Sequence, residues 1–207
     1  EGRAALSQGL IATASRRAIE TTSRLEKLVD LGRALVVVEP SVLGLFKQDY
    51  ANLLQNDSLF QKLKTNCYDS VDYLLKIIAK HGLDPAAWFS RDRLPGPIRL
   101  FYHCHCQQKS VGSGLGAETL FRRLGLDVET SQVECCGMAG SFGYKKDYYD
   151  ISMAAGQALF DQIDQAAQVE GELAVLAGGI SCAEQILAGT GKTTYHPMEI
   201  LARMLIR

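Results

Sequence analysis

Short apolar runs alternate with longer stretches of helical periodicity along most of the chain. Residues 34–38 form an unbroken apolar run, which is typical of a strand that is covered on both faces. Residues 70–80 instead carry apolar side chains from Val71 to Ile78 at i, i+3, i+4 and i+7, the spacing of one helix face. The same patterns predict strands at 98–102, 127–132 and 173–177, and helices at 4–31, 42–55, 115–124 and 144–169, after residue 182 and up to residue 207.

Strands that alternate with helices favour an α/β fold with parallel strands. The two halves also resemble each other, because residues 36–42 align with 176–182 and both segments follow a long predicted helix. We therefore expect duplicated helix–strand units with short parallel sheets, divided into residues 1–90 and 91–207. Residues 84–97 hold three of the five prolines and the only tryptophan, and we interpret them as a connector.

The composition is that of an ordinary globular protein, and it excludes several classes of function. The 207 residues are 47% hydrophobic and 22% charged with a net charge of −1, so nothing points to nucleic acid as a partner. No apolar run reaches the roughly 18 residues that a transmembrane helix needs, and no signal peptide is recognised. Six cysteines are too few for a disulfide scaffold of this length, so they indicate ligands in a reducing compartment and predict a cytoplasmic location.

Two adjacent cysteines, Cys135 and Cys136, open a glycine-rich stretch. Neighbouring Cα atoms lie about 3.8 Å apart, whereas a disulfide usually needs about 4.4 Å or more, so both thiols are better placed to face a third group. Gly137 allows a positive φ and lets backbone N–H groups point at an anion. Cys106, the pair and Cys182 each follow a predicted strand, and the carboxyl ends of parallel strands share one edge of a sheet. We therefore expect these four cysteines, at the carboxyl ends of strands, to form one site.

Four thiolates suit a [4Fe–4S] cluster, and they also suit a structural zinc ion. The adjacent pair favours the cluster, because zinc sites usually space two ligands by two to four residues. Plain buried thiols are the remaining interpretation. Cys104 lies two positions before Cys106 and is either an extra ligand or a bystander, and reversible oxidation of these two thiols is a weaker alternative. Cys67 lies outside the pattern and is interpreted as a packed thiol.

Two histidines flank Cys104, and each has two interpretations. His103 and His105 are candidates to hydrogen-bond a sulfur or to replace it as a ligand, and the alternative is a satisfied loop histidine. His196 precedes Pro197 and is interpreted as a helix-entry residue. Lys109 would offset the negative charge of a thiolate-bound cluster if it is not simply solvated.

Five segments of the second half carry a resemblance to a known family. They are residues 105–109, 135–144, 152–153, 181–186 and 196–199. This half resembles the CCG-type cysteine-rich domain that is found in heterodisulfide reductase and in the iron–sulfur subunit of glycolate oxidase. It is most similar to the C-terminal part of FAD-linked, iron–sulfur D-2-hydroxyacid dehydrogenases of the D-lactate or D-2-hydroxyglutarate type. In the first half, residues 2–3, 7–10 and 39–41 resemble the tail of a preceding cysteine-rich repeat.

The resemblance implies an iron–sulfur electron-transfer domain that receives electrons from a flavin after a D-2-hydroxy acid (D-lactate, glycolate or D-2-hydroxyglutarate) has given up a hydride. It implies a [4Fe–4S] cluster, with His105 and Gly137 in cofactor binding and the four cysteines as ligands. The FAD-binding domain or subunit and the ferredoxin-like module that it also implies lie outside this sequence, and no substrate chemistry is expected on this chain alone. Because enzymes of this kind often feed a respiratory chain, a peripheral position at the inner face of the membrane is an alternative to the free cytoplasm.

Three departures from the family pattern lie at or next to its ligand positions. The chain has Glu1 in place of the Cys-Cys pair before Gly-Arg, Val42 in place of a cysteine, and Gln107 in place of a histidine. Residues 1–90 are therefore expected to be a truncated, degenerate first repeat, and residues 91–207 a complete cysteine-rich domain. The alternative function is a zinc-binding or metal-free interaction domain that docks a redox partner.

Overall fold

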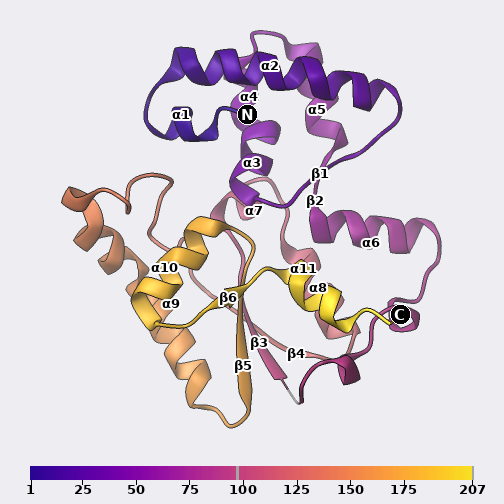
Figure 1. Ribbon diagram of the computed structural model, residues 1–207, viewed down its shortest axis with the longest axis vertical. Coiled ribbons are helices and arrows are strands. Elements are labelled where there is room, and N and C mark those ends of the chain that lie inside the picture. The colour runs from indigo at the N-terminus through magenta and orange to yellow at the C-terminus, as the bar shows by residue number, and fades with distance from the viewer. Residues whose placement is uncertain (97, 207) are drawn as a thin grey trace.

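The strands of the computed structural model, which describes residues 1–96 and 98–206, form two separate parallel sheets (Figure 1). The smaller sheet pairs β1 (Leu35–Val37) with β2 (Cys67–Asp69). The larger has the order β4 (Asp127–Thr130), β3 (Ile98–His103), β5 (Glu172–Ala177), β6 (Thr194–Tyr195). Every pairing between these strands is parallel, which confirms the predicted α/β fold with short parallel sheets.

Figure 1 shows most helices of the first half at the top of the molecule, above the small sheet. The predicted helix at 4–31 is wrong as a single helix, because the chain turns at Gly9, whose φ is +75°, and Ile11 starts a second helix. The helix at 57–66 was not predicted; Asn56 caps it, and Phe60 and Leu63 are its two buried apolar residues. The helical segments are α1 (Arg3–Ser7), α2 (Ile11–Asp30), α3 (Pro40–Gly44), a π-helical turn (Leu45–Asp49), α4 (Tyr50–Leu53) and α5 (Asp57–Asn66).

Alternate residues of the central strand pack on opposite faces of the larger sheet, as the strand period requires. Leu100 and Tyr102 lie in one apolar core, together with residues of α6, α8 and α11. Phe101 lies in a second core with residues of α9 and α10, and Figure 1 shows these two helices together on one side of the sheet. The helices are α6 (Ser70–Lys80), α7 (Cys106–Ser110), α8 (Leu115–Arg123), α9 (Tyr149–Gln168), α10 (Ile180–Thr190) and α11 (Pro197–Met204).

Several predicted boundaries of the second half differ from the structure. The helix predicted from residue 144 begins at Tyr149, after a loop and a short 3₁₀ turn. The two-residue strand β6 and the helix α7 were not predicted. The connector at 84–97 contains two 3₁₀ turns, and Pro97, like Arg207 at the end of the last helix predicted, lies outside the described residues.

The division into units at residues 1–90 and 91–207 stays a prediction. Val71 and Ile78, on α6, pack in the same core as Leu100 of the larger sheet. This helix therefore contributes to the second unit although it lies in the first part of the chain. Within the described residues, every helix is too short or too polar to cross a membrane.

Candidate metal centre

The ends of β3, β4 and β5 bring the four predicted cysteines together. Cys106 is the first residue of α7, which follows β3, and Cys182 lies in the first turn of α10, which follows β5. Cys135 and Cys136 lie in the loop after β4. The thiol of Cys135 interacts with Cys106 and Cys136, and Cys136 interacts in turn with Cys182. The four sulfurs therefore form one continuous group at a single edge of the sheet.

The four thiols perturb one another strongly. Contacts with the thiols of Cys106 and Cys136 hold the pKa of Cys135 far below its usual range, and contact with the Cys136 thiol lowers the pKa of Cys182. The same contacts, together with burial, raise the pKa of Cys106 and Cys136, because a second negative charge would lie beside an existing thiolate. Negative charge on closely spaced sulfurs favours the binding of a positively charged metal group.

The loop that carries the adjacent pair also aims backbone donors at sulfur. The N–H of Gly137 donates to the Cys135 sulfur over 3.4 Å, and the N–H of Met138 donates to the Cys136 sulfur. Gly137 has a φ of +94°, and a Cβ there would overlap the backbone carbonyl of Ser152. The predicted requirement for glycine at this position therefore has a geometric cause.

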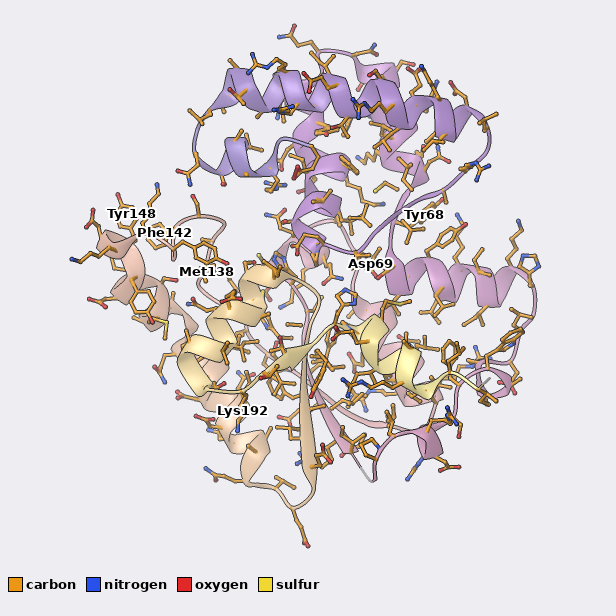
Figure 2. All side chains as sticks on the ribbon, viewed as in Figure 1. Tyr68, Asp69, Met138, Phe142, Tyr148 and Lys192 are labelled. Atoms are coloured by element: carbon orange, nitrogen blue, oxygen red, sulfur yellow. The ribbon has the colours of Figure 1, made fainter. Side chains whose placement is uncertain are left out.

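Two buried polar residues that sequence reasoning did not single out hold this loop in place. The Ser152 hydroxyl donates to the carbonyl of Gly137 over 2.9 Å, and the Gln185 amide donates to the Ser152 carbonyl over 2.9 Å. Figure 2 shows Met138 near α10, with Phe142 and Tyr148 side by side at the start of α9; their rings stack with centroids 4.7 Å apart. Ser152 and Gln185 both lie in segments of the family resemblance, which was the available signal.

His105 is buried at the start of α7, and its two ring nitrogens contact Gln107 and Ser181, each of which is next to a cysteine of the site. Its Nδ1 accepts a hydrogen bond from the N–H of Gln107 over 3.0 Å, and its Nε2 lies 3.3 Å from the Ser181 hydroxyl. Burial alone would lower the pKa of His105, but a hydrogen bond to Cys182 and nearby negative charges raise it. His105 therefore orients the first turn of the helix that presents Cys106, with its Nδ1 3.8 Å from that sulfur.

His103 is the last residue of β3 and points its ring into the group of thiols. Its Nδ1 lies 2.8 Å from the Ser131 hydroxyl, while its Nε2 has no hydrogen-bond partner among the described residues. Ligand atoms of His103, Cys136 and Cys182 all lie within 4.8 Å of one another. The four thiols are a donor set that fits a thiolate-bound metal ion or cluster, and His103 lies where it can either replace a sulfur as a ligand or donate a hydrogen bond to one.

Cys104 and Cys67 lie apart from this group. An extended segment would place Cys104 and Cys106 on one face, but the chain enters α7 at Cys106, and the Cys104 thiol instead lies 3.9 Å from the Ser113 carbonyl. Cys67 is buried in the first unit, where burial raises its pKa to about 11. Lys109 is held by the Val133 carbonyl at 2.6 Å. His196 caps α11, as predicted.

A buried polar relay joins the end of β2 to the helix that carries Cys106. The Gln108 amide donates to Asp69 over 2.8 Å, and the Gln108 carbonyl oxygen accepts from the N–H of His105 over 3.2 Å. Asp69 also accepts from the N–H of Val71. Figure 2 shows Asp69 between the upper helices and the larger sheet. Each acceptor oxygen of the relay meets an N–H donor, and this fixes the orientation of the Gln108 amide.

We expect Asp69→Asn to lower the free energy of unfolding by about 2 kcal/mol, since the new amide would place a donor against the Gln108 donor in a buried site. Burial raises the pKa of Asp69. The stabilisation that this side chain provides is therefore present in acid and is lost as the pH rises through the raised pKa. The difference in the free energy of unfolding between wild type and variant should therefore narrow as the pH rises above about 4. Urea unfolding across this range measures it, with the exposed Asp57→Asn as control. A pH-independent gap would contradict the assignment.

The chain is similar to parts of several dehydrogenases and oxidases. It is 27% identical over 194 residues to the D-2-hydroxyglutarate dehydrogenase of Pseudomonas putida, which covers 94% of this chain and 17% of that protein. It is 34% identical over 112 residues to one subunit of the anaerobic glycerol-3-phosphate dehydrogenase of Escherichia coli, covering 54% of this chain and 27% of that protein. The Escherichia coli glycolate oxidase iron–sulfur subunit is 26% identical over 182 residues, covering 86% and 41%.

The chain spans less than half the length of each of these relatives. No family model matches it, and no solved structure matches it. The relatives nevertheless include both kinds of protein that the sequence motifs indicated. The predicted resemblance is confirmed: the chain is a homologue of D-2-hydroxyglutarate dehydrogenases, of an anaerobic glycerol-3-phosphate dehydrogenase subunit and of the glycolate oxidase iron–sulfur subunit, in keeping with a CCG-type cysteine-rich domain.

Proposed function

We propose that this chain is the iron–sulfur electron-transfer part of a FAD-linked oxidoreductase that acts on D-2-hydroxy acids. The observation that carries the proposal is the convergence of Cys106, Cys135, Cys136 and Cys182 at the ends of three strands. Four cysteines are the usual ligand set of a [4Fe–4S] cluster. The name of the glycolate oxidase iron–sulfur subunit supports the same cofactor class.

In this proposal the four cysteines hold the cluster, which supplies one-electron transfer when it is bound. The N–H groups of Gly137 and Met138 stabilise negative charge on the sulfurs. Cys136 and Cys182 are buried, which keeps water from one side of the site, while Cys106 and Cys135 are partly exposed. Electrons would therefore enter and leave on the side of Cys106 and Cys135.

The hydride chemistry is assigned to a FAD-binding domain or subunit, with a ferredoxin-like module between the flavin and this domain. The names of the D-2-hydroxyglutarate dehydrogenase and the glycolate oxidase subunit support a 2-hydroxy acid as substrate, and D-lactate belongs to the same class. We propose a cytoplasmic location, with attachment to the inner face of the membrane through a partner as the alternative.

A zinc-stabilised domain that docks a redox partner is the second candidate. The observation that favours it is the mutual proximity of His103, Cys136 and Cys182, whose ligand atoms lie within 4.8 Å. With one further thiol these residues would complete a Cys₃His set, which is a known structural zinc site. Such a site would stabilise the folded domain, and it would carry out no redox chemistry.

Metal analysis after purification without oxygen distinguishes these two functions. We expect about four irons and about four sulfides per chain, with broad visible absorbance. About one zinc ion per chain and no sulfide would contradict the electron-transfer proposal and favour the zinc domain. Reconstitution with iron and sulfide under reducing conditions, followed by the same analysis, guards against loss of the cluster during purification.

A further inference from the structure

The two ring nitrogens of His103 have different surroundings. The residue is completely buried at the end of β3. Its Nδ1 lies 2.8 Å from the Ser131 hydroxyl oxygen. Its Nε2 has no hydrogen-bond partner among the described residues, and one nitrogen of the ring lies within 4.8 Å of the sulfurs of Cys136 and Cys182. A buried, unpartnered nitrogen that faces sulfur needs an explanation, because such groups are costly.

The contact with Ser131 decides which nitrogen carries the proton. Ser131 is buried, and its own N–H donates to the carbonyl of Tyr102 over 2.9 Å, which fixes its position. Within the described part of the chain, the only hydrogen-bond partner of its hydroxyl is His103. If Nδ1 carried the proton, the hydroxyl hydrogen of Ser131 would be buried without an acceptor. If the hydroxyl donates to Nδ1, the hydroxyl hydrogen has its acceptor, Nε2 carries the ring proton, and that proton can find an acceptor only among the neighbouring sulfurs.

We propose that His103, with its ring proton on Nε2, is a positioning residue that donates a hydrogen bond to the sulfur of Cys182. Thiolate sulfur is an acceptor, and an N–H donor beside it stabilises negative charge. Hydrogen bonds to the sulfurs of a cluster raise its reduction potential, because the reduced state carries more negative charge. The effect on potential rests on the proposed function, whereas the proton position on His103 does not.

A histidine ligand requires the opposite arrangement. Nε2 would then have to be unprotonated, and Nδ1–H would donate to Ser131. The proton position therefore separates a hydrogen-bond donor from a ligand before any metal is added.

The first test is ¹⁵N NMR of the metal-free chain with labelled histidine, with the His103→Gln variant used to assign the signal. We expect an unprotonated Nδ1 and a protonated Nε2, and a loss of this preference in Ser131→Ala. A proton on Nδ1, or no change in Ser131→Ala, would overturn the proposal. Because no cluster is needed, this outcome is independent of whether the chain binds iron.

The second test is a redox titration of the cluster-loaded wild type, His103→Gln and His103→Leu. Glutamine can place an amide N–H near the position of Nε2, whereas leucine removes every donor. We expect all three to keep the same iron content. In His103→Leu the ratio of oxidised to reduced cluster at a fixed potential should rise about tenfold, which is about 59 mV for one electron, with a smaller shift in His103→Gln.

Two results of the titration would overturn the proposal. An unchanged potential in His103→Leu would show that His103 donates nothing to the cluster. Loss of iron in both His103 variants, with full iron in Ser131→Ala, would identify His103 as a ligand. If the wild type itself takes up no iron and sulfide, the proposed function fails, and the proton position measured by NMR still decides the role of His103.

Discussion

Cys136→Ser is expected to reduce iron and sulfide from about four of each per chain to nearly none. Cys136 is one of the two central cysteines of the group, because its thiol interacts with both Cys135 and Cys182. It is only 3% exposed, so water has little room to replace the lost ligand. A serine hydroxyl is less acidic than a thiol and is a poor ligand for iron, so the site would keep three thiolates around an open position. Iron and sulfide analysis with visible absorbance measures the effect.

The matched controls are Cys67→Ala and Cys104→Ala. Both residues are buried thiols, as Cys136 is, but Cys67 packs in the core of the first unit and Cys104 packs toward Gln108 and Ser113. We expect each control to lose some stability and to keep its iron. Equal iron in Cys136→Ser and wild type would contradict the ligand assignment, and loss of iron in Cys104→Ala would show that this thiol belongs to the site after all.

Sequence reasoning succeeded where one segment determines its own structure. The apolar runs at 34–38 and 173–177 both became strands. The expected cover on both faces is wrong for the first of them, because Val36 is 45% exposed at the outer face of the small sheet. The candidate site followed from the same step, since each cysteine segment comes after a strand and parallel strands end at one edge. No knowledge of the contacts between segments was needed for either step.

The features that were missed depend on partners far along the chain. The segment at 57–66 has a weak apolar pattern, and β2 and β6 are two or three residues long, so their pairing is set by the strands beside them. Gln185 and Ser152 hold the cysteine loop only because α9 and α10 pack together. The relay from Asp69 to Gln108 likewise joins β2 to α7, and neither residue has a local pattern that reveals it.

Among substitutions outside the cysteines, Gly137→Ala is expected to have the largest effect. A positive φ costs an alanine about 1 to 2 kcal/mol. Here the new Cβ would also overlap the Ser152 carbonyl and lie 2.9 Å from the N–H nitrogen of Gly156, in a region that is already closely packed. Overpacking of this kind costs a further 1 to 3 kcal/mol, roughly. The loop must therefore shift, and with it the N–H donors and the two adjacent thiols.

The control for this substitution is Gly125→Ala, which isolates the backbone cost. Gly125 has a φ of +78°, and a Cβ there would meet nothing within 4 Å. We expect Gly125→Ala to lower the free energy of unfolding by about 1 kcal/mol and to keep its iron. Gly137→Ala should lose about 3 kcal/mol and most of its iron, as measured by urea unfolding of the metal-free chain and by iron analysis after reconstitution. Equal losses in the two variants would mean that the cysteine loop tolerates a side chain at Gly137, and the close approach to Ser152 would then have no part in holding the site together.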